Sequence, residues 1–147
     1  MKTTFRKLLP LTLLFCIFIS CLASCSLSIG SKKAADLWAN ATYKEDTTFG
    51  TGAKTITVAV AVGDNRVVFT IKTDKATLGD AMMEHQLLAG DQEQYGLYVK
   101  VVNGIEADYE KDQSWWGLYS AGELLVTGVD TTEIMDGDTF EMVRNVG

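Results

Sequence analysis

The stretch that decides the fold is Thr55-Ile-Thr-Val-Ala-Val-Ala-Val62, which is followed by Gly63-Asp-Asn65 and then by Arg66-Val-Val-Phe-Thr-Ile71. Its apolar side chains alternate with small or polar ones, which is the period of a strand with one buried face. The Gly-Asp-Asn run between the two halves has the composition of a tight turn. The stretch therefore predicts a β-hairpin that points a row of Val, Ile and Phe side chains toward a core.

A helix is predicted to follow the hairpin, beginning at Thr77. Threonine is a favourable N-cap, and Asp80 stands three residues later, as in a capping box. Five residues then recur with the spacing of one helical face: Leu78, Ala81, Met82, His85 and Leu88. Gly90 is predicted to end the helix as its C′ residue. His85 is the only histidine of the chain and has no evident partner, so we interpret it as a packing or surface residue.

The rest of the chain predicts short strands separated by turns. Alternation indicates strands at residues 97–102 and 115–119, and the last strand points Phe140 and Met142 toward the core. The acidic segment 108–112 lacks the glycine and the terminal glutamate of a calcium loop, so we expect a solvated loop there. Hairpin, helix and strands in this order predict an α+β fold class. The arrangement is β-grasp-like, with an N-terminal β-hairpin and one helix packed on a mixed sheet.

The stretch Trp115-Trp-Gly-Leu-Tyr119 is the most informative for function. Neighbouring side chains of a strand point to opposite faces, so Trp115 and Tyr119 point outward if Trp116 and Leu118 face the core. An outward aromatic pair is either covered by a helix or loop, or forms a platform for a ligand or a partner. The candidate ligand-binding residues are Trp115, Trp116, Leu118, Tyr119 and Tyr98.

Residues 1–24 have the composition of a signal peptide. Lys2, Arg6 and Lys7 precede an apolar run that is too short to span a membrane. The segment Leu22-Ala-Ser-Cys25 resembles the lipobox of bacterial lipoproteins. This resemblance implies cleavage before Cys25 and lipidation of Cys25, which would place the protein on the bacterial cell membrane, facing outside or the periplasm.

The rest of the chain divides into a lead-in and one domain. Residues 25–53 are predicted to be a lipidated tether and lead-in, because their first part is small and polar. Residues 54–147 have the size of a single domain. Since two of the three cysteines leave with the signal peptide, no disulfide is predicted in the mature chain.

The charge and the residue content exclude several classes of function. Removing three cations with the signal peptide leaves ten Lys and Arg against nineteen Asp and Glu, a net charge of −9. Such an acidic chain is unsuited to binding nucleic acid. With one histidine and no free thiol in the mature chain, the sequence shows no catalytic constellation, so we expect no enzyme, no metal site and no cofactor.

Four short motifs in order carry a family resemblance over about residues 55–147. They are Thr77-Leu-Gly-Asp-Ala81, Gly96-Leu-Tyr-Val99 with Val102-Asn-Gly-Ile105, Trp115-Trp-Gly-Leu-Tyr119 with Gly122-Glu123, and Thr127-Gly-Val-Asp130 with Asp136-Gly-Asp138. This pattern is similar to the transcobalamin-like C-terminal domain family, whose bacterial members are often surface lipoproteins. In the vitamin B12 carriers of the family the domain closes over cobalamin, and the tryptophan strand lies beside the corrin. Those carriers have Gln where this chain has Gly117.

Two functions remain open from the sequence. The resemblance implies a lipid-anchored module that captures cobalamin or another flat ligand for an importer. The alternative is a non-catalytic module in which the same aromatic side chains dock a surface-protein partner.

Overall fold

The computed structural model describes residues 27–147. The predictions for the signal peptide and for Cys25 lie outside the described residues. Among the described residues, the buried core lies between Ala41 and Met142. Residues 26–147 contain this core and are expected to fold as an independent domain.

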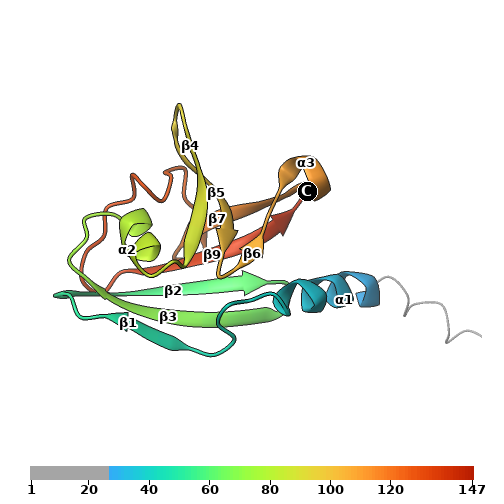
Figure 1. Ribbon diagram of the computed structural model, residues 1–147, viewed down its shortest axis with the longest axis horizontal. Helices are drawn as coiled ribbons and strands as arrows, with labels where there is room; N and C mark the ends of the chain where they lie inside the picture. Colours follow the sequence, from blue (N-terminus) through green and yellow to red (C-terminus); the bar gives the residue numbers. More distant parts are fainter. Residues whose placement is uncertain (1–26) are drawn as a thin grey trace, which may run out of the picture.

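Two sheets and three helices make up the described chain (Figure 1). The larger sheet has the order β1-β3-β2-β9-β7-β8 and the smaller one the order β4-β5-β6. The strands of the larger sheet are β1 (Thr47–Gly50), β2 (Lys54–Val62), β3 (Asn65–Thr73), β7 (Ser114–Ser120), β8 (Glu123–Leu124) and β9 (Thr139–Val146). Those of the smaller sheet are β4 (Leu88–Glu93), β5 (Gly96–Val102) and β6 (Ile105–Glu106), and the helices are α1 (Leu27–Trp38), α2 (Leu78–Glu84) and α3 (Tyr109–Asp112).

The larger sheet is mixed, which confirms the predicted α+β class. Strand β1 runs parallel to β3, and β9 runs parallel to β2, whereas the other pairs are antiparallel. The predicted hairpin is present as β2 and β3, with Val58 opposite Phe69. Among the described residues, no helix is long and apolar enough to cross a membrane.

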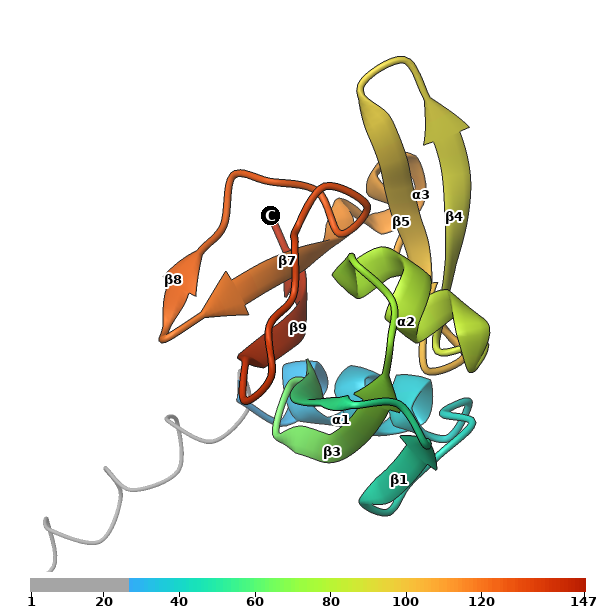
Figure 2. The ribbon, with the colours of Figure 1, turned by 90° about the vertical axis from the view of Figure 1, so that its left-hand side faces the viewer.

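One face of the larger sheet carries the core. Its inward row includes Val58, Phe69 and Met142, all completely or almost completely buried. Helix α2 and the smaller sheet lie on this face, as Figures 1 and 2 show together. From α2, Leu78 and Met82 reach the same core, because the helix presents its apolar stripe to the sheet. Because side chains alternate between the two faces of a strand, every second residue of each strand contributes to this core.

Helix α2 begins as predicted and ends earlier. The Thr77 hydroxyl accepts a hydrogen bond from the Asp80 amide at 3.3 Å, which confirms the N-cap. His85 is the C-cap, and its ring stacks on Phe49 with 5.2 Å between centroids. The prediction that Gly90 ends the helix is wrong, since Gly90 lies in β4 beside a register shift. Tertiary packing explains the difference, because Leu88 is buried as the first residue of strand β4 and not as part of the helix.

The ordered fold reaches further toward the N-terminus than the domain start expected at residue 54. Strand β1 extends the sheet by pairing with β3, where Phe49 lies opposite Ile71. Phe49 also contacts Tyr43 and Phe69 edge to face, with centroids 5.2 and 5.6 Å apart. Helix α1 packs Trp38 against the core, in the segment expected to be a tether and lead-in. A four-residue strand paired to a distant one leaves little periodic signal in the sequence.

A buried ion pair joins Arg144 of β9 to Asp112 of α3. Arg144 of β9 is directed into the core face, and its side chain is only 4% exposed. Its guanidinium donates to Asp112 Oδ2 at 2.7 Å, to Ser114 Oγ at 2.8 Å and to the Glu106 carbonyl at 2.9 Å. The segment 108–112 is a short helix instead of the expected loop, and residues 109–111 are exposed to solvent as expected. Its last residue, Asp112, compensates the buried charge of Arg144.

Acid is expected to weaken the fold through Asp112. Hydrogen bonding from the Ser114 hydroxyl, then from the Arg144 guanidinium, lowers the pKa of Asp112 from 3.8. A carboxyl whose pKa is lower in the folded state stabilises the fold above its unfolded pKa, and this contribution disappears as pH falls below that value. The urea concentration at the midpoint of unfolding should therefore decrease as the pH is lowered from about 5 to about 3. The variant Asp112→Asn should show a shallower decline, and an equally steep one would exclude this carboxyl as the cause.

Candidate functional site

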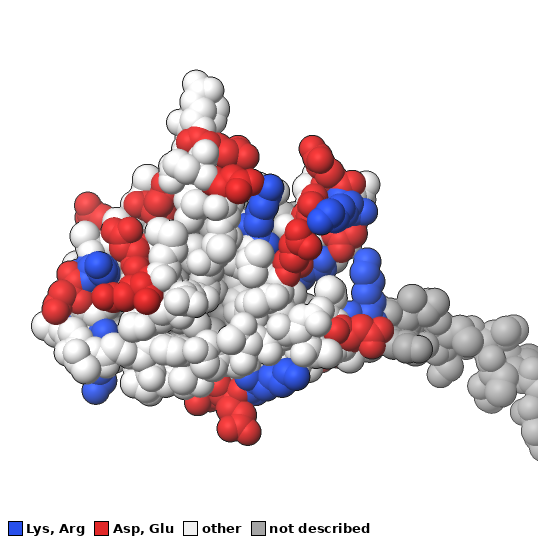
Figure 3. Space-filling view, viewed as in Figure 1, with Lys and Arg blue, Asp and Glu red and all other residues white. Residues whose placement is uncertain are grey.

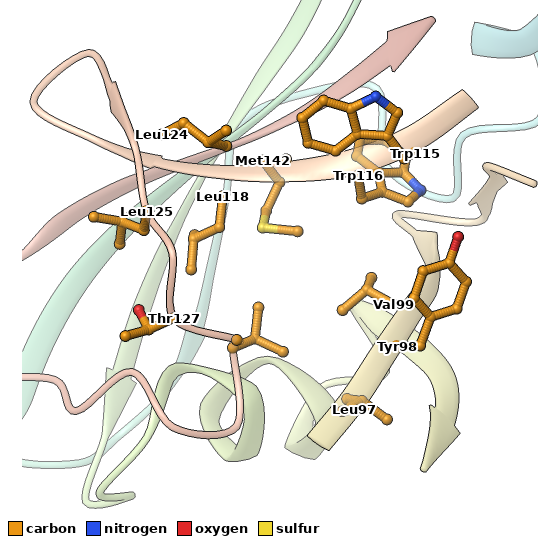
Figure 4. Close-up of a pocket in the computed structure, with 13 residues that line it drawn as sticks. Leu97, Tyr98, Val99, Trp115, Trp116, Leu118, Leu124, Leu125, Thr127 and Met142 are labelled. Carbon is orange, nitrogen blue, oxygen red and sulfur yellow. The ribbon is translucent and has the colours of Figure 1, made fainter. Parts of the chain in front are cut away.

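The described chain has an apolar cleft of about 240 Å³ between β7, β5 and the segment 124–129 (Figure 4). Its floor and walls come from four segments of the sequence: residues 97–99, 115–118 and 124–129, and Met142. The lining residues are Leu97, Tyr98, Val99, Trp115, Trp116, Gly117, Leu118, Leu124, Leu125, Thr127, Gly128, Val129 and Met142.

Strands β7 and β9 form the floor of the cleft. Leu118 lies directly opposite Met142 in the antiparallel pair, and both point to the core face. Trp116 is two residues away on the same face and is 8% exposed. Facing this floor is β5, where Val99 points toward the cleft in Figure 4. The cleft exists because the β4–β5 hairpin stands beside β7 instead of joining the larger sheet.

Asp130 fixes the position of the segment 124–129, which forms the wall of the cleft beside β5 and β7. Its carboxylate accepts a hydrogen bond from the Leu97 amide at 3.0 Å, which ties the segment 124–129 to the start of β5. A Cβ atom on Gly128 would lie 2.8 Å from the same carboxylate, so a larger residue here would displace the Asp130 side chain. The Gly79 amide donates to the Val129 carbonyl at 2.8 Å and joins the wall to α2. The Thr-Gly-Val-Asp and Thr-Leu-Gly-Asp motifs are therefore parts of one structural link.

The outward aromatic pair lies on the opposite face of β7 from the floor of the cleft. Trp115 and Tyr119 are partly buried, and the Tyr119 hydroxyl donates to Asn145 Oδ1 at 3.4 Å. A Cβ atom on Gly117 would lie 2.9 Å from the Trp115 ring and 2.8 Å from the Tyr119 ring. The two rings thus close over Gly117, and a side chain at this position would point away from the cleft floor.

Four of the five candidate residues line the cleft, in different ways. Trp116 and Leu118 form the cleft floor, as the strand period predicts. Tyr98 borders the cleft, but on β5 it lies on the other side from Val99 (Figure 4). Trp115 touches the cleft from the edge of β7, whereas Tyr119 does not line it.

The remaining lining residues were not predicted from the sequence. They include Leu97, Leu125, Val129 and Met142, which belong to three separate segments. Alternation along β5 does place Leu97 and Val99 on one face, which is the only sequence signal for this wall. The docking of β5 against β7 has no local signature.

The cleft is lined mainly by apolar side chains, and one lining residue has an unpaired buried donor. Trp116 Nε1 is buried and has no hydrogen-bond partner among the described residues. Leaving such a donor unpaired costs roughly 1–3 kcal/mol. Within residues 27–147, no group of three or more His, Cys, Asp and Glu side chains could hold a metal ion. The cleft is suited to binding by shape and aromatic contact.

Comparisons with known proteins agree with this architecture. Residues 75–143 match the family model of a domain of unknown function, DUF4430. The structure of haptocorrin in complex with Cbi has a TM-score of 0.56 at 17% sequence identity, and the match covers 67% of this chain and 26% of haptocorrin. This likeness supports the predicted resemblance to transcobalamin-like domains at the level of the fold. No curated protein sequence is similar to the chain.

A bacterial protein of known structure is more similar in sequence. It comes from Ruminococcus gnavus ATCC 29149, is named as a candidate metal-binding protein, and is 37% identical with a TM-score of 0.61. The match covers 64% of this chain and 98% of the Ruminococcus gnavus chain. The present chain therefore belongs to the same protein family as this Ruminococcus gnavus protein.

Proposed function

We propose that the protein is a lipid-anchored module that captures a flat, largely apolar ligand of the cobalamin type in the cleft and passes it to an importer. The observation that carries the proposal is the apolar cleft, in which Trp116 and Leu118 face Val99 across an open space. Aromatic and aliphatic walls suit a flat ring system, since they offer a large contact area at low entropic cost. The haptocorrin likeness supports the same proposal through the fold, which we regard as β-grasp-like.

The size of the cleft bears on how the ligand would be held. Pockets that enclose a drug-sized ligand have volumes of about 300–1,000 Å³. At about 240 Å³, this cleft is smaller and would cover one face of a corrin ring. A second protein, such as the importer, would cover the other face. The lipidated Cys25 would keep the module at the membrane surface.

A titration with corrinoids tests the proposal. Cobinamide added to residues 26–147 should quench tryptophan fluorescence and shift the absorption spectrum of the corrinoid. Replacing Val99 with alanine removes apolar contact from the cleft wall and should weaken binding by about 1 kcal/mol, roughly fivefold. The matched variant Val143→Ala lies on the outer face, opposite Gly117, and should leave affinity unchanged.

A different result would redirect the proposal. If cobinamide and cyanocobalamin give no response at high micromolar concentration, direct capture of corrinoids is excluded. The second candidate is then a docking module for a surface protein. It is favoured by exposed apolar side chains at the rim, where Leu124 is 49% exposed and Val126 is fully exposed. Loss of a partner's binding in Val126→Asp, with the fold intact, would support it.

A further inference from the structure

We propose that the cleft selects uncharged or cationic ligands and rejects anionic ones. This inference rests on the proposed function and specifies the charge of the ligand for the same cleft. Three observations support it: the uncharged lining of the cleft, the ion pair made by the lysine of β5, and the carboxylates near the cleft.

The lining offers nothing that could neutralise an anion. None of the thirteen residues that form the cleft is Lys, Arg, His, Asp or Glu. A carboxylate or sulfonate that entered would lose hydration without gaining an opposite charge, which is costly. Among the lining side chains, the unpaired donor Trp116 Nε1 is a neutral N–H and is itself buried, so it supplies no charge that could compensate an anion.

The cation on β5 is already compensated. Lys100 follows Val99 directly, so its side chain points to the other side of the strand. It pairs with Asp91 of β4 at 2.5 Å. The hydrogen bond and the charge of Asp91 raise the pKa of Lys100 from 10.5, as expected where carboxylates dominate the surroundings. Lys100 therefore does not serve the cleft as a free anion partner.

The rim is acidic. The Asp130 carboxylate accepts a hydrogen bond from the amide of the lining residue Leu97. Glu123 is the neighbour in sequence of another lining residue, Leu124. Figure 3 shows carboxylates over β4, over α3 and near α2, with Lys or Arg side chains beside them and a mostly uncharged surface between these groups. Residues 25–147 carry a net charge of −9. The resulting negative potential attracts cations and repels anions before contact.

Two porphyrins of equal shape test the inference without depending on a natural ligand. Tetrakis(N-methylpyridinium)porphyrin is cationic, and tetrakis(sulfonatophenyl)porphyrin is anionic. Both would be titrated into residues 26–147 by absorbance and tryptophan fluorescence. The cationic porphyrin should bind at least tenfold more tightly, and the ratio should shrink as salt screens the rim. Equal binding, or tighter binding of the anionic porphyrin, would overturn the inference while leaving the proposed function in place.

Two lysine variants test whether the charge preference arises at the cleft or from the surface as a whole. Leu124→Lys puts a cation at the rim and should tighten binding of the anionic porphyrin by about two- to fivefold, the effect of an exposed ion pair. Val146→Lys changes the net charge equally at the far end of β9 and should have little effect. Equal effects of the two variants would mean that binding is a general surface attraction, which overturns the inference. Absence of binding by the cationic porphyrin also overturns it, and the cobinamide titration then shows whether the proposed function fails as well.

Discussion

Replacing Trp116 with alanine is expected to lower the free energy of unfolding by about 3–5 kcal/mol. Trp116 is 8% exposed and belongs to the continuous core formed by α2, both sheets and the segment 124–129. Removing its indole would leave a cavity beneath the cleft, because β7 is held in place by its pairing with β9. Urea unfolding of residues 26–147, followed by circular dichroism, measures the effect.

Two further variants separate burial from hydrogen bonding at this position. Trp115→Ala should cost clearly less, since Trp115 lies on the outer face and is only partly buried. Trp116→Phe should also cost less than Trp116→Ala, because it keeps an aromatic ring and removes the unpaired Nε1 donor. If Trp115→Ala were the more destabilising change, the assignment of the two faces of β7 would be wrong.

Replacing Arg144 with methionine is expected to lower the free energy of unfolding by about 3 kcal/mol. The change keeps most of the apolar stem and removes the charge that satisfies Asp112, Ser114 and the Glu106 carbonyl. The value lies at the lower end for broken buried pairs, since the Asp112 side chain is 26% exposed and can regain water. Thermal and urea unfolding of the variant measure it.

The exposed ion pairs of Lys111 provide the control. Lys111 lies 3.2 Å from Glu106 Oε1 and 3.3 Å from Asp108 Oδ2, with most of its side chain in solvent. Lys111→Met should therefore change the free energy of unfolding by no more than about 1 kcal/mol. Equal losses for Arg144→Met and Lys111→Met would contradict a special role for the buried guanidinium.

Much of the secondary structure follows from short-range patterns. The alternation over residues 55–71 is sufficient for the hairpin, and it also determines that Val58 and Phe69 face the same way. The start of α2 is equally local, because the Thr77 hydroxyl caps an amide only three residues away. The end of α2 is not local: it depends on Leu87 and Leu88, which are buried by contacts outside the helix.

Part of the candidate site was predictable and part was not. The strand period places Trp116 and Leu118 on one face, and the structure puts both in the cleft floor. The same period places Trp115 and Tyr119 outward. It does not show that their rings cover Gly117, because that contact also involves Asn145 from β9.

The sequence by itself determined the hairpin, the first turn of α2 and the two faces of the tryptophan strand, since each depends on backbone geometry over a few residues. Only the tertiary structure decided that a cleft exists. Its walls meet through contacts between distant residues, such as the hydrogen bond from the Leu97 amide to Asp130, thirty-three positions away. The buried Arg144–Asp112 pair depends in the same way on the approach of α3 to β9. Such contacts have no local periodicity, so the cleft and its unpaired Trp116 donor emerge only when the sheets and the segment 124–129 are packed together.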